Sequence, residues 1–311
     1  MSLIFENYKF RCSSLGHIMT CLPEPITPEQ LKELAGLKKE KEEAEKAKKR
    51  FFKYQQEAID KLEKLANGKD ELPTGCITHL EDIFRSQFWG RKRLVYNKYL
   101  EKGNIVEEDS LDLISKLDGV PYWKNTQQFE NDYIQGSPDN IHDGTVRDTK
   151  SNFDLDTFDK ADMTKLYEYQ VKGYMWLTGY SKGELCYCLV NTPYHRLKAE
   201  EKSLFYAMGQ PEETDSKWIE AVCQLERNMI FDMAAFRKEF PNADLMHGRQ
   251  FQIGSVTRTI EWKHDIPPKF RVKRFPVTLE DKDKEAIIRR VTMCREWLVN
   301  RELETLKLLE E

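Results

Sequence analysis

The stretch from Gly136 to Lys150 contains acidic and basic side chains whose spacing suits the binding of a metal ion beside a phosphate. It reads Gly-Ser-Pro-Asp-Asn-Ile-His-Asp-Gly-Thr-Val-Arg-Asp-Thr-Lys. On a strand, residues two apart share a face, so Asp148 and Lys150 point the same way. With Asp139 they would bring two carboxylates next to one ammonium group. That grouping is costly in an apolar core, but it can hold a hard divalent cation.

Two short strands joined by a turn are predicted to position these side chains. Asp143-Gly144 provides turn residues, and Thr145-Val146 begins a second extended run. Asp139 would then lie at the end of the first strand, and Asp148 and Lys150 in the second. Charged hairpin tips are also common on protein surfaces, so the flanking sequence has to decide between a surface turn and a catalytic one.

The sequence on both sides of the turn favours the catalytic interpretation. Upstream, a helix is predicted from Gly103 to Leu117, with Glu107 on its apolar face and Glu108 sharing that face less well. Downstream, a helix is predicted from Thr164 to Thr178, with Gln170 and Tyr174 four residues apart on one face. An apolar run then follows that is typical of a buried strand, Leu185 to Val190.

This order of elements resembles the PD-(D/E)xK nuclease superfamily, and most of all its lambda exonuclease (YqaJ-like) branch of phage recombination nucleases. The residues that carry the likeness are Gly103-Asn104, Glu107, Ser137-Pro138-Asp139, Asp148-Thr149-Lys150, Gln170 and Tyr174 to Thr178. One departure is Asp148, where the lambda enzyme has Glu. The resemblance implies an α/β (α+β) fold: a central mixed β-sheet flanked by helices, with a restriction-endonuclease-like core. The charge pattern of residues 28–67 adds a charged helical arm.

The resemblance also implies phosphodiester hydrolysis at a Mg²⁺ or Mn²⁺ site. Asp139, Asp148 and the carbonyl of Thr149 would bind the first ion, and Glu107 would help to hold a second, which stabilises the leaving oxygen. Lys150 would either help to deprotonate the attacking water or stabilise the charge of the transition state. The sequence leaves these two roles open.

Four further residues are expected near the substrate phosphates. By resemblance, Ser137 and Gln170 would line the site near the scissile or terminal phosphate. Arg11 and Ser13 match an Arg and a helix-capping Ser that lambda-type exonucleases use for the DNA 5′ phosphate, although their spacing is shorter here. A helix capped by Ser13 or Ser14 would offer backbone N–H groups to an anion. The alternative is an ordinary helix cap with a solvent-facing Arg11.

Overall charge does not mark the chain as a nucleic-acid binder, because 33% of its 311 residues are charged and the net charge is −4. Any basic surface therefore has to be local. A basic helix is predicted from Gly75 to Lys102, and its cations are Arg85, Arg91, Lys92, Arg93, Lys98 and Lys102. A second basic stretch contains Lys269, Arg271, Lys273 and Arg274.

A single nuclease domain is predicted over residues 1–311, with a helical arm at about 28–67, a catalytic core at about 75–195 and a helical C-terminal extension at about 198–311. The arm would follow a rigid break at Pro23 to Pro28 and stop at Gly68. Lys38 to Arg50 has almost no apolar residue, so this region is either a solvated arm or half of a helical hairpin with an apolar base. In the extension, a helix is predicted over Asp215 to Phe240.

The cysteines indicate a reducing compartment. There are seven, an odd number, with no Cys-x-x-Cys pair, and no signal peptide is recognisable. We therefore expect a cytoplasmic protein, in the host cytoplasm if the chain is phage-encoded. No apolar run approaches the roughly 20 residues that span a bilayer.

Three functions of different classes are compatible with these features. The first is a metal-dependent 5′-to-3′ exonuclease on linear double-stranded DNA, acting in phage-type recombination or repair. By resemblance it would work with a single-strand-annealing protein and as a homo-oligomer, a ring trimer. The second is a PD-(D/E)xK endonuclease or RecB-like nuclease module, and the third a non-catalytic DNA-binding protein that keeps the fold. The intact set of Asp139, Asp148 and Lys150 argues against the third, and Met175 to Thr178 favours the first over the second.

Overall fold

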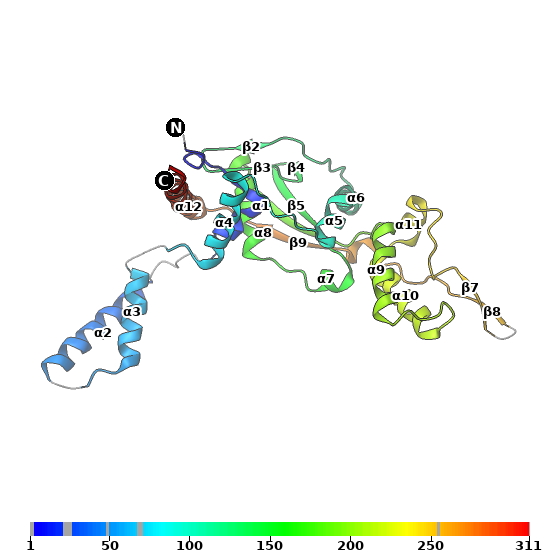
Figure 1. Cartoon of the computed structure of the whole chain (residues 1–311), viewed down its shortest axis with the longest axis horizontal. Coiled ribbons are helices and arrows are strands. Elements are labelled where there is room, and N and C mark those ends of the chain that lie inside the picture. The colour runs from blue at the N-terminus through cyan, green and yellow to red at the C-terminus, as the bar shows by residue number, and fades with distance from the viewer. Residues whose placement is uncertain (1–2, 21–26, 48–49, 67–70, 254–255, 311) are drawn as a thin grey trace. The chain divides into compact units, whose positions relative to one another are not determined.

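The computed structural model describes residues 3–20, 27–47, 50–66, 71–253 and 256–310 (Figure 1). It divides into two compact units. The first, which we term the helical unit, comprises Met1–Glu6, His17–Arg91 and Ala286–Glu311. The second, the sheet unit, comprises Asn7–Gly16 and Lys92–Glu285.

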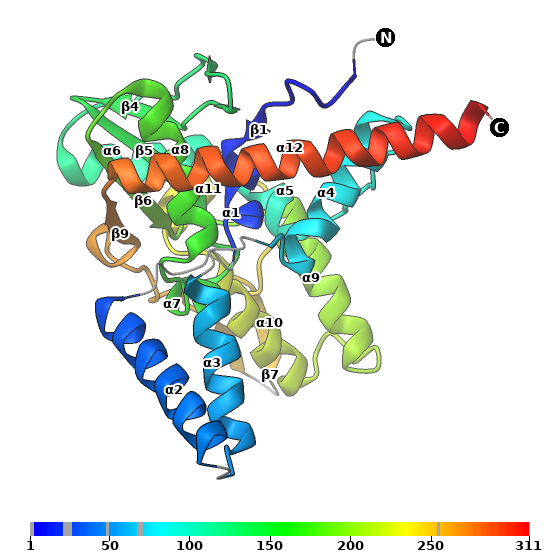
Figure 2. The ribbon, with the colours of Figure 1, turned by 90° about the vertical axis from the view of Figure 1, so that its left-hand side faces the viewer.

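In the helical unit, the charged stretch near the N-terminus forms a helical hairpin. Its helices are α2 (Pro28–Lys46) and α3 (Lys53–Ala66), which lie side by side in Figure 2. A small apolar core of Leu34, Ile59 and Leu62 joins them. Of the two predicted alternatives, the hairpin with an apolar base is the one that forms. The predicted break at Pro23 and the predicted stop at Gly68 lie outside the described residues.

The rest of the helical unit packs around two further helices, α4 (Thr74–Gln87) and the C-terminal part of α12 (Asp281–Glu310). Phe5 stacks on Phe84 of α4, with ring centroids 5.7 Å apart. The carboxylate of Glu302 on α12 accepts hydrogen bonds from the backbone N–H groups of Ile4 and Phe5, at 2.9 and 3.3 Å. These contacts hold the N-terminal segment to both helices.

The sheet unit contains a mixed four-stranded sheet in the order β4-β5-β6-β9. Its strands are β4 (Asn140–His142), β5 (Thr145–Ser151), β6 (Lys182–Cys188) and β9 (Val272–Val277). The central pair, β5 and β6, is parallel, and the two outer pairings are antiparallel. Three shorter strands form a second sheet in the order β1-β3-β2: β1 (Phe10–Arg11), β3 (Ile134–Gly136) and β2 (Phe129–Glu130). The predicted mixed sheet is therefore confirmed.

Helix α8 (Lys165–Thr178), which forms where the downstream helix was predicted, packs on strands of both sheets. It begins at the cap Thr164 and ends before Gly179, whose φ of 73° suits a glycine. A side chain at Gly183 of β6 would lie 2.4 Å from the sulfur of Met175, so the strand needs a glycine there. A Cβ at Gly16 would lie 2.3 Å from the Cα of Leu166, so that helix α1 (Cys12–Ile18) meets the backbone of α8 directly.

Other helices surround the sheet: α5 (Lys98–Ile105), α6 (Glu107–Asp118) and α7 (Leu155–Asp159). The C-terminal extension contributes α9 (Tyr194–Ala207), α10 (Ser216–Met229), α11 (Met233–Glu239), the hairpin of β7 (Gln250–Ile253) and β8 (Val256–Thr259), and a short 3-10 turn at Pro268–Phe270. In the described part of the chain, no helix is long and apolar enough to cross a membrane.

Several predicted helix boundaries were wrong. The predicted basic helix stops at Gln87, because Gly90 takes a φ of 61°, and residues 91–97 have no regular structure before α5. The predicted helix from Gly103 is two helices, of which the second begins at Glu107. The predicted helix over 215–240 is broken between α10 and α11, where Asp232 caps the second helix.

Candidate active site

The hairpin of β4 and β5 carries the acidic residues that the sequence singled out. Its turn is at Asp143 and Gly144, both with positive φ (47° and 68°), as the two-residue turn of a hairpin requires. Asp139 directly precedes β4 instead of ending the first strand, which was the prediction. Its Oδ2 accepts hydrogen bonds from the backbone N–H of Thr149 at 2.6 Å and from the Thr149 hydroxyl at 2.9 Å. The neighbouring strand therefore fixes the Asp139 carboxylate.

Asp148 and Lys150 lie on one face of β5, as predicted. The ammonium Nζ of Lys150 is 2.7 Å from Asp148 Oδ2, and the Asp148 side chain is only 1% exposed. The other oxygen, Oδ1, accepts a hydrogen bond of 2.8 Å from Gln170 Nε2 on α8. The same Nε2 group donates to the hydroxyl of Tyr174 at 3.1 Å. A helix and a strand together thus orient the second carboxylate.

Burial makes the ionised state of this acidic pair costly. Burial, reinforced by the charge of Asp148, raises the pKa of Asp139 to about 7. Burial also raises the pKa of Asp148, against the lowering effect of Lys150. For Lys150, burial lowers the pKa, but the charge and hydrogen bond of Asp148 outweigh it, so that its pKa is raised. One ammonium group does not fully compensate the two carboxylates, and a divalent cation would stabilise them.

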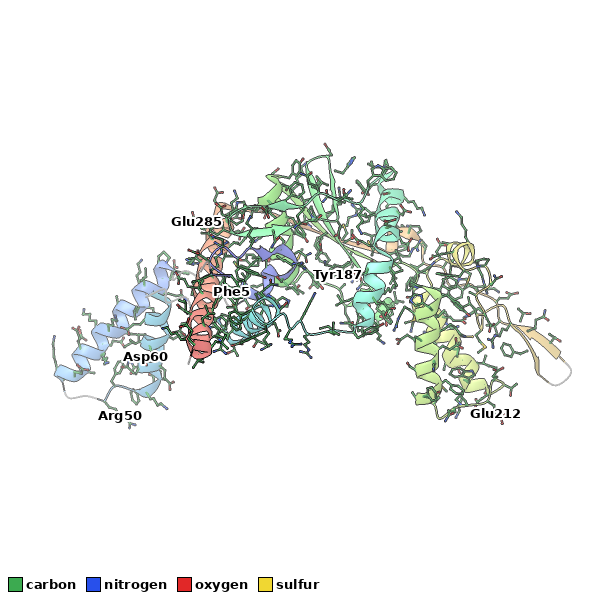
Figure 3. All side chains as sticks on the ribbon, turned by 45° about the horizontal axis from the view of Figure 1, so that its top comes forward. Phe5, Arg50, Asp60, Tyr187, Glu212 and Glu285 are labelled. Carbon is green, nitrogen blue, oxygen red and sulfur yellow. The ribbon has the colours of Figure 1, made fainter. Side chains whose placement is uncertain are left out.

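The predicted catalytic residues share one cavity of about 440 Å³ in the sheet unit. The predicted site residues that line it are Ser13, Glu107, Asp139, Asp148, Thr149, Lys150 and Gln170, and Tyr174 lines it as well. Tyr187 of β6, labelled in Figure 3, lines it too. The structure thus brings together side chains from α1, α6, α8 and the β4–β5 hairpin.

Glu107 is the first residue of α6 and lines the cavity, whereas Glu108 is exposed. The carboxylate of Glu107 forms an ion pair of 2.7 Å with Lys124. No sequence signal pointed to Lys124, because it lies between α6 and β2 in a stretch without regular structure or periodicity. The hydrogen bond from Lys124 to Glu107 raises the pKa of the lysine.

The residues present fit a magnesium or manganese ion bound mainly by Asp139 and Asp148. Among the described residues, no group of three or more His, Cys, Asp or Glu side chains is close enough to enclose a metal ion. Mg²⁺ does not need such a cage, since it commonly binds through one or two carboxylates and keeps several waters. Within the described structure, the buried Asp148 Oδ2 has the ion pair with Lys150 but no neutral hydrogen-bond donor. The surroundings of that oxygen therefore suit a cation.

Two of the predicted substrate contacts are not in the cavity. The hydroxyl of Ser137 donates to the carbonyl of Gln127 at 2.9 Å and accepts from Asn125 Nδ2 at 3.0 Å. The loop before β2 therefore already supplies hydrogen-bond partners to this hydroxyl. Arg11 is exposed on β1 and does not line the cavity. Ser13 does, but it does not cap a helix, because α1 already begins at Cys12.

Much of the predicted basic surface is engaged within the protein. Lys102 is fully buried, Lys98 pairs with Glu200 at 2.6 Å, and Arg85 pairs with Asp82. Of the cations predicted for the helix, the three at residues 91–93 are exposed in the segment without regular structure.

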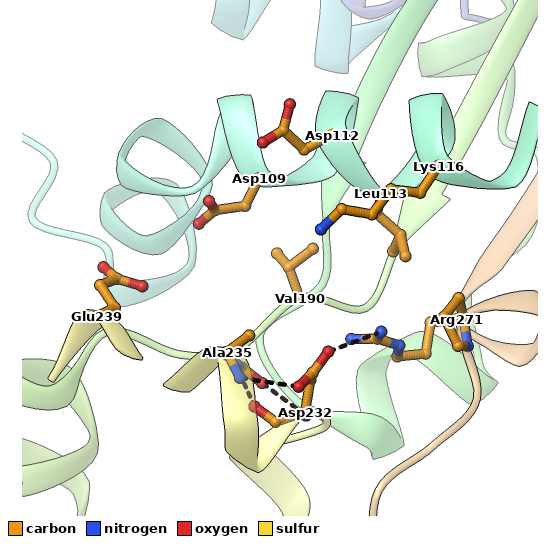
Figure 4. A pocket seen from close by; sticks show the side chains of 11 residues that line it. Asp109, Asp112, Leu113, Lys116, Val190, Asp232, Ala235, Glu239 and Arg271 are labelled. Carbon is orange, nitrogen blue, oxygen red and sulfur yellow. Dashed lines mark hydrogen bonds and ion pairs between the residues drawn. The ribbon is translucent and has the colours of Figure 1, made fainter. Parts of the chain in front are cut away.

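Three cations of the second predicted basic stretch also have partners within the protein. Arg274 pairs with Asp118 at 2.7 Å, and Lys273 donates to the carbonyl of Asp159 at 2.8 Å. Arg271 lies 3.5 Å from Asp232 beside a separate cavity of about 140 Å³ (Figure 4). The acidic residues that line this second cavity are Asp109 and Asp112 of α6, Asp232, and Glu239 of α11. These three side chains of the basic stretch thus have partners within the protein, and the phosphate-facing patch in this stretch stays a prediction.

The fold and the grouped carboxylates define the class of structure to which the chain is similar. It superposes on a phage-related exonuclease from Haemophilus somnus 129PT with a TM-score of 0.55 and 18% identity, over 96% of this chain and 97% of that one. The chain therefore has the fold of a phage-related exonuclease, and the predicted resemblance is confirmed at the level of the fold.

An alkaline exonuclease (LHK-Exo) from Laribacter hongkongensis is less similar. Its TM-score is 0.45 at 11% identity, over 76% of this chain and 86% of that one. The same protein in complex with dAMP also has a TM-score of 0.45, at 10% identity, over 97% of this chain and 93% of that one. No family model matches the chain, and no curated protein matches it.

Proposed function

We propose that the chain is a metal-dependent DNA exonuclease that hydrolyses linear double-stranded DNA from 5′ to 3′. The observation that carries this proposal is the convergence of Asp139, Asp148 and Lys150 with Glu107 in one cavity. A fold shared with a phage-related exonuclease supports it. A phage-type recombination or repair role and a cytoplasmic location belong to the same proposal, as do a single-strand-annealing partner and a ring trimer.

The proposed site residues have two roles: some would bind a cation, and Lys150 would stabilise charge. Asp139, held by Thr149, and Asp148, held by Gln170, would bind Mg²⁺ or Mn²⁺ together with the Thr149 carbonyl. Such an ion supplies a water nucleophile at neutral pH and polarises the phosphate. Glu107 would help to hold a second ion, and would then exchange its partner Lys124 for that ion.

Of the two roles that the sequence left open for Lys150, the geometry supports charge stabilisation. Its ammonium contacts Asp148 at 2.7 Å, and the raised pKa favours the protonated form. A protonated amine can donate to a phosphate oxygen or orient a water, but it does not accept the proton of that water.

The test is digestion of linear and covalently closed duplex DNA with Mg²⁺, with product sizes followed over time. We expect the linear form to shorten progressively and the closed circle to survive. The Asp139→Asn, Asp148→Asn and Lys150→Ala variants should stay folded and lose on the order of 10²-fold or more in rate, because each removes a group that acts on the transition state. Rapid cutting of closed circles would favour the endonuclease, and cleavage by all three variants would overturn the site.

End chemistry tests the proposed grip on the 5′ phosphate. Linear duplex with 5′-phosphoryl ends should be digested faster than duplex with 5′-hydroxyl ends. Because Ser13 lines the cavity while Arg11 lies outside it, Ser13→Ala and Arg11→Ala compare the two candidate contacts. Loss of the preference in Arg11→Ala would place the arginine at the DNA end. A preference that survives in both variants would show that the phosphate is held by other groups.

A further inference from the structure

Lys102 is a fully buried lysine, 0% exposed, that lies on α5 just outside the candidate active site. Its Nζ donates to the carbonyl of Phe153 at 2.8 Å and to the carbonyl of Val190 at 3.0 Å. Among the described residues, no carboxylate forms an ion pair with it. The aromatic ring of Phe231 lies below the ammonium, with Nζ 5.7 Å from the ring centroid. Burying a cation in such surroundings is costly, so an apolar residue would serve packing better.

The electrostatics of Lys102 agree with this geometry. Burial lowers its pKa to about 7, and the charge of Asp154 only partly opposes that effect. Near neutral pH both protonation states are therefore populated. Each of them still has at least two N–H groups, so either state can donate to both carbonyls.

The two carbonyls lie where the central strands of the sheet separate. β5 and β6 pair in parallel as far as Ser151 and Cys188. Phe153 follows the first strand and Val190 follows the second, and Lys102 bridges them just beyond the last pair. The hydroxyl of Thr192 also donates to the Phe153 carbonyl, at 3.2 Å. Lys102 thus ties α5 to the ends of both strands, and β5 is the strand that carries Asp148 and Lys150.

The same helix leads directly to the other carboxylate of the site. α5 ends at Ile105, and α6 begins two residues later with Glu107. The backbone N–H of Val106 donates to the Lys102 carbonyl at 3.0 Å, so the junction of the two helices is anchored on this residue. Gly103 and Asn104, which follow Lys102, line the cavity.

We propose that Lys102 is a positioning residue that sets the distance between Glu107 and the carboxylates of the β4–β5 hairpin. It touches neither substrate nor metal and acts through the backbone of α5 and of the two strand ends. The proposal rests on the proposed function, because it treats Glu107 as the holder of a second metal ion. Groups that orient metal ligands commonly change metal affinity by about 10- to 100-fold when they are removed.

The test compares Lys102→Met with Lys102→Gln, which keeps an uncharged N–H donor on a side chain one atom shorter. Mn²⁺ binding, followed by electron paramagnetic resonance of the free ion, should show that Lys102→Met binds the weaker of two ions at least about tenfold less tightly. The stronger site, formed by the aspartates, should be unchanged. On linear duplex with Mg²⁺, the same variant should lose kcat and need more Mg²⁺ for half-maximal rate, with KM for DNA unchanged. Lys102→Gln should recover part of both losses.

Lys172→Met is the matched control, because Lys172 is also a buried lysine of the sheet unit, paired with Glu168 and Asp283 away from the cavity. It should leave both Mn²⁺ affinities unchanged even if it unfolds at a lower temperature. The proposal is overturned if Lys102→Met is folded and binds Mn²⁺ as tightly as the unaltered protein does. It is also overturned if Lys172→Met weakens Mn²⁺ binding by the same factor as Lys102→Met. An unaltered protein that binds Mn²⁺ but cleaves no DNA would overturn the proposed function, and the Mn²⁺ comparison would still decide the role of Lys102.

Discussion

Gln170 on α8 donates a hydrogen bond of 2.8 Å to Asp148 on β5, and this bond joins the two elements at the centre of the site. The resemblance implied that Gln170 faces the substrate. In the structure its amide Nε2 is engaged by Asp148 and Tyr174, so Gln170 orients a carboxylate. A carboxylate that is held in this way would keep the geometry needed for the proposed metal even when none is bound.

We expect Gln170→Leu to weaken Mg²⁺-dependent cleavage by about 10- to 100-fold, because Asp148 loses the hydrogen bond that Gln170 donates. The control is Tyr174→Phe, which removes the other partner of the same amide and leaves the bond to Asp148 in place. Its rate should stay within about threefold. Steady-state rates on linear duplex at several Mg²⁺ concentrations measure both. Equal losses in the two variants would show that the helix packing matters and not the bond to Asp148.

Glu107 and Glu108 are adjacent and chemically identical, but they differ in position. Glu107 lines the cavity and Glu108 is exposed. Glu107→Gln should therefore reduce cleavage by on the order of 10²-fold, whereas Glu108→Gln should have little effect. The comparison needs only rates and thermal unfolding of the two purified variants. The reverse order would mean that the second metal is held by the other glutamate.

The pKa of Asp139 predicts how pH acts on the metal-free protein. In the folded state this pKa is about 7, above its ordinary value of 3.8. The folded protein therefore binds more protons than the unfolded chain between these values, and its stability falls as pH rises from 3.8 to 7. Metal binding needs the ionised carboxylate, so Mg²⁺ affinity should increase as pH rises through about 7.

Asp139→Asn should remove the loss of stability that ionisation of Asp139 causes in the metal-free protein. At pH 8 in EDTA we expect the variant to be more stable than the unaltered protein by roughly 1–3 kcal/mol, since one pKa unit corresponds to about 1.4 kcal/mol and the shift is shared with Asp148. Urea unfolding at pH 5 and pH 8 measures the difference in the free energy of unfolding between the variant and the unaltered protein. Asp143→Asn, at the exposed turn of the same hairpin, is the control and should change little. A variant that is less stable at pH 8 would contradict the inferred repulsion.

The exposed cations Arg91, Lys92 and Arg93, which were predicted to lie on the basic helix, are candidates for contact with the DNA backbone. Replacing all three with alanine should weaken DNA binding and reduce the slope of log K against log salt by up to about three units, because each phosphate that a cation neutralises adds about 0.9 to that slope. Fluorescence anisotropy over a salt series gives both values. The control replaces three exposed lysines of the α2–α3 hairpin, Lys32, Lys39 and Lys46. If only the control changes the slope, the DNA contact lies on the hairpin.

The β4–β5 hairpin could be predicted because its signals are local. Asp143-Gly144 specifies the turn, and the spacing of Asp148 and Lys150 specifies a shared face wherever the strand lies. Burial of a charged residue is a different matter, since it depends on partners far along the chain. Arg274 meets Asp118, and Lys102 meets carbonyls at Phe153 and Val190. In the sequence such lysines and arginines look like surface cations, which is why both basic stretches were predicted to face DNA.

Boundaries failed where one residue interrupts an otherwise helical pattern. Gly90 has a positive φ, so the helix α4 cannot continue through it, although helix-forming residues follow in the sequence.

The prediction that Ser137 lines the site failed for another reason. Ser137 follows β3 and precedes Asp139, as the resemblance requires, but the loop containing Asn125 and Gln127 satisfies its hydroxyl. Sequence order alone does not show which loop will cover a side chain.

The parallel pairing of β1 with β3 has a consequence for how the protein is made. Phe10 pairs with Ile134, so the first strand to leave the ribosome has no partner until the chain beyond Ile134 has followed it. The β4–β5 turn, in contrast, can close within microseconds of its synthesis. Pairings between distant residues form slowly, because a long loop must close before any contact rewards it. Asp139 and Asp148 can therefore come into register through a local turn, whereas Ser13, which follows the first strand, reaches the cavity only when a long loop has closed.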